Sequence, residues 1–167
     1  MRRITLLISF IPVVTVLWAQ RSEMKPEKTS TKWIKNQQIL FQYSYPDSMS
    51  FSPTWRPGRN RIFEYIYQAS ENPDVSDDEL TEIVCFQLPN TGSLSFTLKD
   101  SALIKAKAYF MRGCFCPDRG YVLLNQGIIK GKKLSDKIWS ISINVTVSGS
   151  QGEYQRKYSG KFKYAKD

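Results

Sequence analysis

The clearest pattern in this chain is an alternation of hydrophobic and polar residues near its C-terminus. Between positions 138 and 147 every second residue is apolar, and the residues between them are serine, asparagine and threonine; the apolar set is Trp139, Ile141, Ile143, Val145 and Val147. Successive side chains of a β-strand point to opposite faces, so this pattern predicts a strand with one buried face. A Ser/Gly-rich turn then leads into a second alternating run ending at Tyr164. We therefore predict a long C-terminal hairpin, with Tyr154, Tyr158, Phe162 and Tyr164 on one side of its second strand.

Shorter runs of the same kind occur upstream, at positions 39–45, 62–67, 84–88, 94–98 and 127–134. The turn-forming sequence Pro89–Gly92 separates the third run from the fourth, and this predicts a second hairpin. About eight strands with turn signals roughly every 8 to 12 residues are typical of an all-β antiparallel β-sandwich, with a closed β-barrel as the alternative.

Two segments could contain helix. Ser76–Glu79 has the spacing of a capping box and predicts one helical turn. The segment 101–113 is rich in good helix formers, but Ile104, Ala106, Ala108 and Phe110 also alternate with polar residues. We favour a strand for 101–113 and leave a helix open, so the domain should contain at most one short helix.

The N-terminal segment has a different pattern. A basic start, Arg2-Arg3, precedes an apolar run that ends at Ala19, and these are the parts of a secretory signal peptide. The run is too short to cross a membrane and remain there. Positions 20–32 are polar and predict a flexible tether. We expect a signal peptide at 1–19, the tether at 20–32, and one β-rich domain at 33–167 of a protein exported to the periplasm or beyond.

The charge and the composition narrow the class of function. The formal net charge is +9, and it falls to about +7 without Arg2 and Arg3, which favours anionic partners. Export argues against nucleic acid, so we expect an anionic glycan, the envelope surface or another envelope protein. The chain contains no histidine, which excludes histidine-dependent hydrolases and imidazole-based zinc sites.

The three cysteines are Cys85, Cys114 and Cys116. An exported protein meets oxidising conditions, and a bond between Cys114 and Cys116 would be strained. We therefore predict a disulfide from Cys85 to Cys114 or, as the alternative, to Cys116. A metal site of three thiolates would lack a visible fourth ligand, and we predict no metal and no cofactor.

The segment 46–60 is the candidate binding site. Its prolines predict a loop, and Trp55, Arg56 and Arg59 lie within it. An aromatic face can stack on a sugar, and an arginine can bind a carboxylate or phosphate through two hydrogen bonds. The other interpretation is that Trp55 covers the open end of the core.

Several short sequences resemble small exported proteins of Bacteroidota, most of which are uncharacterised. They are Arg112–Pro117, Gly127–Lys133, Trp139, Tyr158–Phe162 and the Ala19-Gln20 end of the signal. The resemblance implies an envelope protein but no activity.

Together these observations favour a non-enzymatic binding or interaction module at the bacterial cell envelope. A lipocalin-like small-molecule carrier is the second hypothesis, and a histidine-independent hydrolase is the third. An interior cavity above roughly 300 Å³ would favour the carrier.

Overall fold

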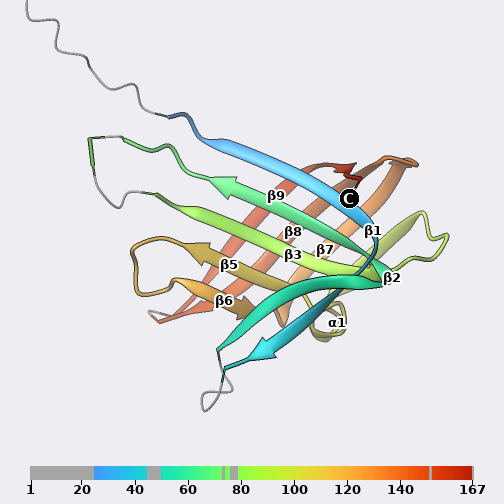
Figure 1. Cartoon of the computed structure of the whole chain (residues 1–167), viewed down its shortest axis with the longest axis horizontal. Helices are drawn as coiled ribbons and strands as arrows, with labels where there is room; N and C mark the ends of the chain where they lie inside the picture. Colours follow the sequence, from blue (N-terminus) through green and yellow to red (C-terminus); the bar gives the residue numbers. More distant parts are fainter. Residues whose placement is uncertain (1–24, 45–49, 73, 76–78, 151, 167) are drawn as a thin grey trace, which may run out of the picture.

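The computed structural model describes residues 25–44, 50–72, 74–75, 79–150 and 152–166. Within them the chain forms nine strands and one short helix (Figure 1). The elements are β1 (Lys28–Tyr43), β2 (Phe51–Gln68), β3 (Thr81–Pro89), β4 (Ser95–Lys99), α1 (Ser101–Lys105), β5 (Tyr109–Gly113), β6 (Gly120–Leu123), β7 (Gln126–Ser135), β8 (Ile138–Gly149) and β9 (Gly152–Tyr164).

All nine strands belong to one sheet, in the order β4-β7-β8-β9-β1-β2-β3-β5-β6. Neighbouring strands are antiparallel except β1 and β9, which run parallel. The all-β class, the antiparallel pairing and the presence of one short helix are thus confirmed for the described part of the chain. The finer prediction is corrected, because the structure has one open sheet rather than the two sheets of a sandwich, and the sheet does not close into a barrel.

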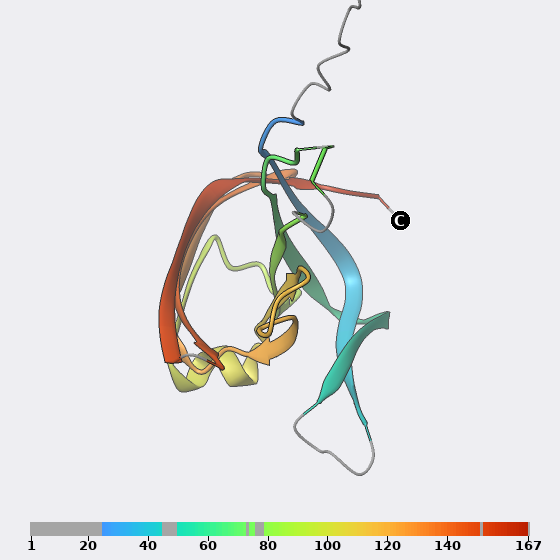
Figure 2. The same ribbon diagram turned by 90° about the vertical axis from the view of Figure 1, so that its left-hand side faces the viewer.

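The sheet bends so strongly that its two halves face each other. Figure 2 shows β7, β8 and β9 curving over the half formed by β1, β2, β3, β5 and β6. One hydrophobic cluster takes side chains from both halves, among them Trp33, Phe63 and Phe86 from one and Trp139 and Phe162 from the other. Each half of the sheet therefore turns an apolar face inward, as in a sandwich, and the alternation in the sequence does not distinguish the two arrangements.

The C-terminal hairpin is confirmed as β8 and β9, which pair from Ile138↔Lys163 to Gly149↔Gly152. The five apolar residues predicted to share one face of β8 are all buried. The other predicted hairpin is wrong, because β3 pairs with β2 and β5 whereas β4 pairs with β7. Residues 90–94 carry the chain from one half of the sheet to the other. The pairing of β4 with β7 needs a glycine at position 131, because the Phe96 ring occupies the space that a side chain there would fill.

The segment 101–113, for which we favoured a strand and left a helix open, contains both a helix and a strand. Helix α1 ends at Lys105, Lys107 takes a positive φ of 49°, and β5 begins at Tyr109. The helical turn predicted at Ser76–Glu79 falls mostly on residues 76–78, which lie outside the described residues.

The predicted loop at 46–60 is corrected, because β2 begins at Phe51 and runs through Pro53 and Pro57. Strand β3 pairs with β2 only from Asn60 onward, so both prolines lie where β2 has β1 as its single neighbour. Proline is tolerated at such an edge because its missing N–H has no strand to bond. The sheet also begins earlier than predicted, since β1 starts at Lys28, inside the proposed tether.

The outer parts of β1 and β2 form a ribbon with its own small core. The register shifts near Gln37, and beyond this irregularity the ribbon packs on the outer face of β2, β3 and β5. This outer cluster contains Ile39, Phe51, Ile62, Cys85 and Tyr109, with Phe41, Trp55 and Ile83 packed against it.

The predicted signal peptide at 1–19 lies outside the described residues. Within the described part of the chain, no helix has the length and hydropathy needed to cross a membrane.

Candidate functional site

A pocket of about 420 Å³ lies between β4, which is one edge of the sheet, and the last residues of β3. Strand β5 pairs only with residues 81–85 of β3, so the last residues of β3 have no strand on that side. Helix α1 covers this free edge, and the Gln87 N–H donates to the Ala106 carbonyl at 2.8 Å. We call this the seam pocket; its lining is Asn60, Gln87, Leu88, Pro89, Leu98, Ala102, Lys105 and Ala106.

A smaller pocket of about 120 Å³ adjoins the seam pocket, and Leu88 and Pro89 line both. This inner pocket lies between the inward face of β2, β8 and the segment that connects β3 to β4. Its lining is Arg61, Leu88, Pro89, Thr91, Ser93, Ser95, Phe96 and Trp139.

Arg61 is the most unusual residue of the inner pocket. It shares the inward face of β2 with Phe63 and Tyr65, and only 5% of its surface is exposed. Its Nη2 donates to the Thr91 carbonyl, and its guanidinium carbon lies 5.2 Å from the centre of the Trp139 ring. No carboxylate of the described residues forms an ion pair with it. Burial lowers the pKa of Arg61, yet an arginine side chain stays protonated in proteins.

Two buried N–H groups at this pocket have no acceptor among the described residues: Nε of Arg61 and Nε1 of Trp139. A buried donor without a partner costs about 1 to 3 kcal/mol, and more when it is charged. The residues that line the inner pocket therefore carry a positive charge and two buried donors without an acceptor among the described residues.

A third pocket of about 250 Å³ continues from the inner pocket past Arg61, Thr91 and Ser93. Lys35, Lys133 and Asp136 also line it, and the Lys133 ammonium lies 2.6 Å from an Asp136 carboxylate oxygen. The Lys35 ammonium lies over the rings of Trp33 and Tyr164, 5.5 Å from each centre. Three cations and one carboxylate thus surround this end of the core.

The structure does not bring the predicted binding residues into one site. Trp55 and Arg56 are consecutive in β2, so their side chains point to opposite faces. The Trp55 ring packs against the outer cluster, with the Lys32 ammonium 5.3 Å from its centre. Arg56 and Arg59 are exposed. The role of all three residues in binding stays a prediction; Trp55 is half-buried against the outer cluster, and not over the open end of the main core as the second interpretation expected.

The predicted disulfide is also corrected. Cys114 is bonded to Cys116, and Cys85 is free and buried in the outer cluster. Cys85 is paired with Tyr109 in β5, five positions before Cys114. At about 3.3 Å per residue this places the two cysteines roughly 16 Å apart along the strand, too far for a disulfide.

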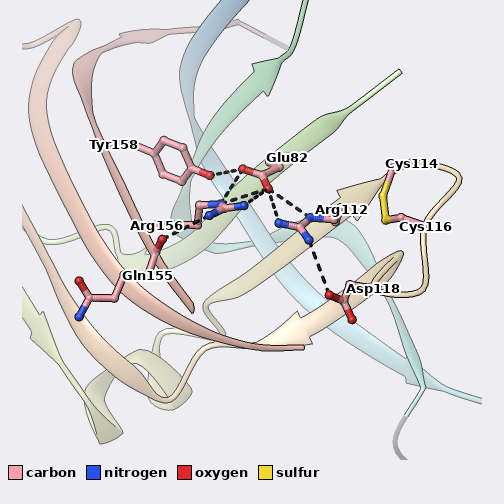
Figure 3. A network of polar contacts seen from close by, with 8 residues as sticks. All are labelled: Glu82, Arg112, Cys114, Cys116, Asp118, Gln155, Arg156 and Tyr158. Carbon is pink, nitrogen blue, oxygen red and sulfur yellow. Dashed lines mark hydrogen bonds and ion pairs between the residues drawn. A yellow bond between two sulfur atoms is a disulfide. The ribbon is translucent and has the colours of Figure 1, made fainter. Parts of the chain in front are cut away.

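A second group of charged side chains lies between the two halves of the sheet (Figure 3). Glu82 of β3 is 3% exposed and accepts hydrogen bonds from Arg112 of β5 and from Arg156 and Tyr158 of β9. The closest distances are 2.7 Å from Arg112 Nη2, 2.9 Å from Arg156 Nη2 and 2.6 Å from the Tyr158 hydroxyl. We call these four residues the Glu82 cluster.

The surroundings hold the Glu82 cluster in place. Both guanidinium groups lie against the Tyr154 ring, at 4.8 Å for Arg112 and 4.6 Å for Arg156. Arg112 also approaches Asp118 at 3.8 Å, next to the loop closed by the disulfide (Figure 3). Burial acts to raise the pKa of Glu82, but the hydrogen bonds from Arg156, Tyr158 and Arg112 outweigh it and lower that pKa. Both arginines of the Glu82 cluster thus have a carboxylate partner, and the cluster ties the two halves of the sheet together, so we regard it as a structural feature.

Our sequence analysis missed both Arg61 and Glu82, although the alternation contains a signal for each. Arg61 is two residues before Phe63, and Glu82 is two residues before Val84, so each charge continues a run of inward apolar positions. A charged residue in phase with a buried face indicates either an internal partner or a site. Glu82 has the partners, whereas Arg61 has no carboxylate among the described residues.

Comparisons with protein families, with curated proteins and with solved structures found no match to this chain.

Proposed function

We propose that this chain is an exported, non-enzymatic binding protein that carries a small, largely apolar ligand in the seam pocket. The observation that carries this proposal is the pocket of about 420 Å³ at the open seam of the sheet. Pockets for small molecules are typically about 300 to 1,000 Å³ with mostly apolar walls. This size supports the carrier among the hypotheses drawn from the sequence, with a pocket open to solvent in place of the interior cavity first expected.

The walls of the seam pocket suit an apolar ligand. Leu88, Leu98, Ala102 and Ala106 supply apolar surface from three different elements. Lys105 at the other side is exposed, so the pocket reaches solvent there. Each Å² of apolar ligand surface that leaves water contributes about 25 cal/mol, so a ligand of modest size can bind tightly enough to be carried.

Export supports the same role. The signal-like pattern at 1–19 would place the chain outside the cytoplasm, where a carrier keeps an apolar ligand out of water. The absence of histidine removes the commonest general base, which favours binding over catalysis.

The seam pocket can be tested with a neutral fluorescent probe, N-phenyl-1-naphthylamine, titrated into the mature protein. Ala102→Phe places a ring in the pocket and should weaken probe binding at least tenfold. Ile104→Phe is the matched control, because Ile104 lies on the same helix and is 55% exposed. Probe binding that is absent from the parent protein, or equal in both variants, would contradict the proposal.

A second candidate function is contact with an anionic glycan of the envelope, favoured by the exposed side chains of Arg56 and Arg59 near the bend of the β1–β2 ribbon. The double variant Arg56→Ala, Arg59→Ala should then lose retention on a heparin or alginate matrix, whereas Lys163→Ala should not. Equal retention of both variants would argue against this face as a binding surface.

A further inference from the structure

We propose that the ligand is an amphipathic monocarboxylate, whose carboxylate lies in the inner pocket against Arg61 while its apolar chain fills the seam pocket. This inference rests on the proposed function, because it assigns the ligand class of the same site. It also explains why a buried cation adjoins an apolar pocket.

The buried charge of Arg61 lacks a carboxylate partner among the described residues. Arg61 is 5% exposed, and among the described residues its only oxygen acceptor is the Thr91 carbonyl. A buried charge is costly unless an opposite charge and hydrogen bonds compensate it. The chain compensates its other inward-facing arginines, since Arg112 and Arg156 both bond Glu82. A bound anion would give Arg61 the counter-charge that the chain itself does not supply.

Two hydrogen-bond donors at the inner pocket also lack an acceptor among the described residues. Nε of Arg61 and Nε1 of Trp139 are both buried donors without an acceptor, and both residues line the inner pocket. The Ser93 hydroxyl, which lines the same pocket, donates to the Ser95 carbonyl at 3.1 Å. The two donors need an acceptor that no described residue supplies. A carboxylate offers two oxygens that only accept and carries the negative charge that Arg61 needs, whereas an alcohol can accept but carries no charge.

The volumes of the two pockets suit a carboxylate with an apolar chain. The inner pocket of about 120 Å³ has room for roughly four water-sized groups of about 30 Å³ each, which suits a single carboxylate. By the same measure the seam pocket of about 420 Å³ holds roughly 14 such groups. A carboxylate on a chain of about 8 to 12 carbons fits the pair of pockets.

Further charged side chains lie near Arg61, in the lining of the third pocket. Lys35 and Lys133 line the third pocket on the far side of Arg61, and Lys133 is already paired with Asp136. Their field makes the inner pocket positive, while the shortage of further buried cations favours a single negative charge over a dianion.

The experiment compares two ligands that differ only in the head group, decanoate and decanol, below the micelle-forming concentration of decanoate and the solubility limit of decanol. Each ligand should displace N-phenyl-1-naphthylamine from the parent protein. Decanoate should bind at least tenfold more tightly than decanol. Arg61→Gln should remove this preference by weakening decanoate, with decanol unchanged. Thermal melts of the variant serve as the folding control, and the comparison on the parent protein needs no variant.

The outcomes separate this inference from the proposed function. Binding of both ligands with equal affinity would leave the carrier in place and overturn the role of Arg61. Binding of neither ligand, together with no binding of the neutral probe, would overturn both proposals. Acetate that competes as well as decanoate would overturn the assignment of the seam pocket to the apolar chain.

Discussion

Removing the charge of Glu82 while keeping its shape should destabilise the fold strongly. Glu82→Gln leaves two guanidinium groups between the halves of the sheet without their carboxylate, and it replaces one acceptor oxygen by a donor amide. The Glu82 side chain is 4% exposed, and those of Arg112 and Arg156 are 14% and 30% exposed. The substitution therefore removes one partner of a largely buried ion pair.

The size of the effect follows from the exposure of the three groups. Removing one member of a fully buried ion pair costs about 3 to 5 kcal/mol. The two arginines are partly exposed and can recover some hydration, so the low end of this range, about 3 kcal/mol, is expected. For a chain of this length that corresponds to a fall in Tm of about 6 to 12 °C.

The assay is urea unfolding followed by tryptophan fluorescence, with Glu153→Gln as the matched control. Glu153 lies in β9, three residues from Arg156, and is exposed, so its neutralisation should change the free energy of unfolding by less than about 0.5 kcal/mol. A loss below about 1 kcal/mol for Glu82→Gln at pH 7 would refute the reasoning from burial.

The effect should also depend on pH in a defined direction. The folded-state pKa of Glu82 lies below its ordinary value of 4.5, because the hydrogen bonds outweigh the opposite effect of burial. A lowered carboxyl pKa stabilises the fold above the unfolded-state pKa, and that contribution is lost as the pH falls through the folded-state value. The difference between parent and Glu82→Gln should thus be full above about pH 5 and shrink below 4.5. A difference that stays constant down to pH 3 would contradict the assignment.

Three further predictions follow from other parts of the fold. Cys85 should not react with a thiol reagent in the folded, non-reduced protein, because burial raises its pKa, and unfolding in denaturant should release one thiol per chain; two or three would contradict the observed pairing. Trp55→Ala should lower the free energy of unfolding by about 2 kcal/mol through the outer cluster, while Arg56→Ala should change it by less than about 0.5 kcal/mol, as measured by urea unfolding. Gly127→Ala should cost at least about 2 kcal/mol in the same assay, since Gly127 has a φ of 118° and a Cβ there would lie 2.6 Å from the Val145 Cα; a neutral result would argue against this close approach.

The sequence predicted strands better than it predicted how they pair. Alternation over 138–147 depends on one strand and one buried face, and both are present in β8. The pairing of Phe96 with Gly131 depends on residues far apart in the chain, and the turn signal at Pro89–Gly92 is the same whether the chain folds back or crosses over.

The candidate site was harder to predict for a similar reason. Trp55, Arg56 and Arg59 stand out because they are close in sequence and flanked by prolines, yet neighbours in a strand face opposite sides. The alternation marks Arg61 as an inward charge, but the tertiary fold alone shows that Trp139 of β8 lies against it and that no carboxylate of the described residues pairs with it. Local sequence indicates which charged residues face the core. Whether such a residue finds an oppositely charged partner depends on the tertiary fold.

The parallel contact between β1 and β9 is a short junction between segments far apart in the chain. Just two Cα pairs, Lys32↔Lys163 and Trp33↔Tyr164, join the two halves of the sheet within the described chain, and the Thr31 hydroxyl donates across the same junction to the Lys161 carbonyl, 130 residues away. Contacts of such long range form slowly, because a large loop must close before they stabilise anything. The two halves of the sheet can therefore join along this junction only when β9, the last strand of the described chain, is available to pair with β1.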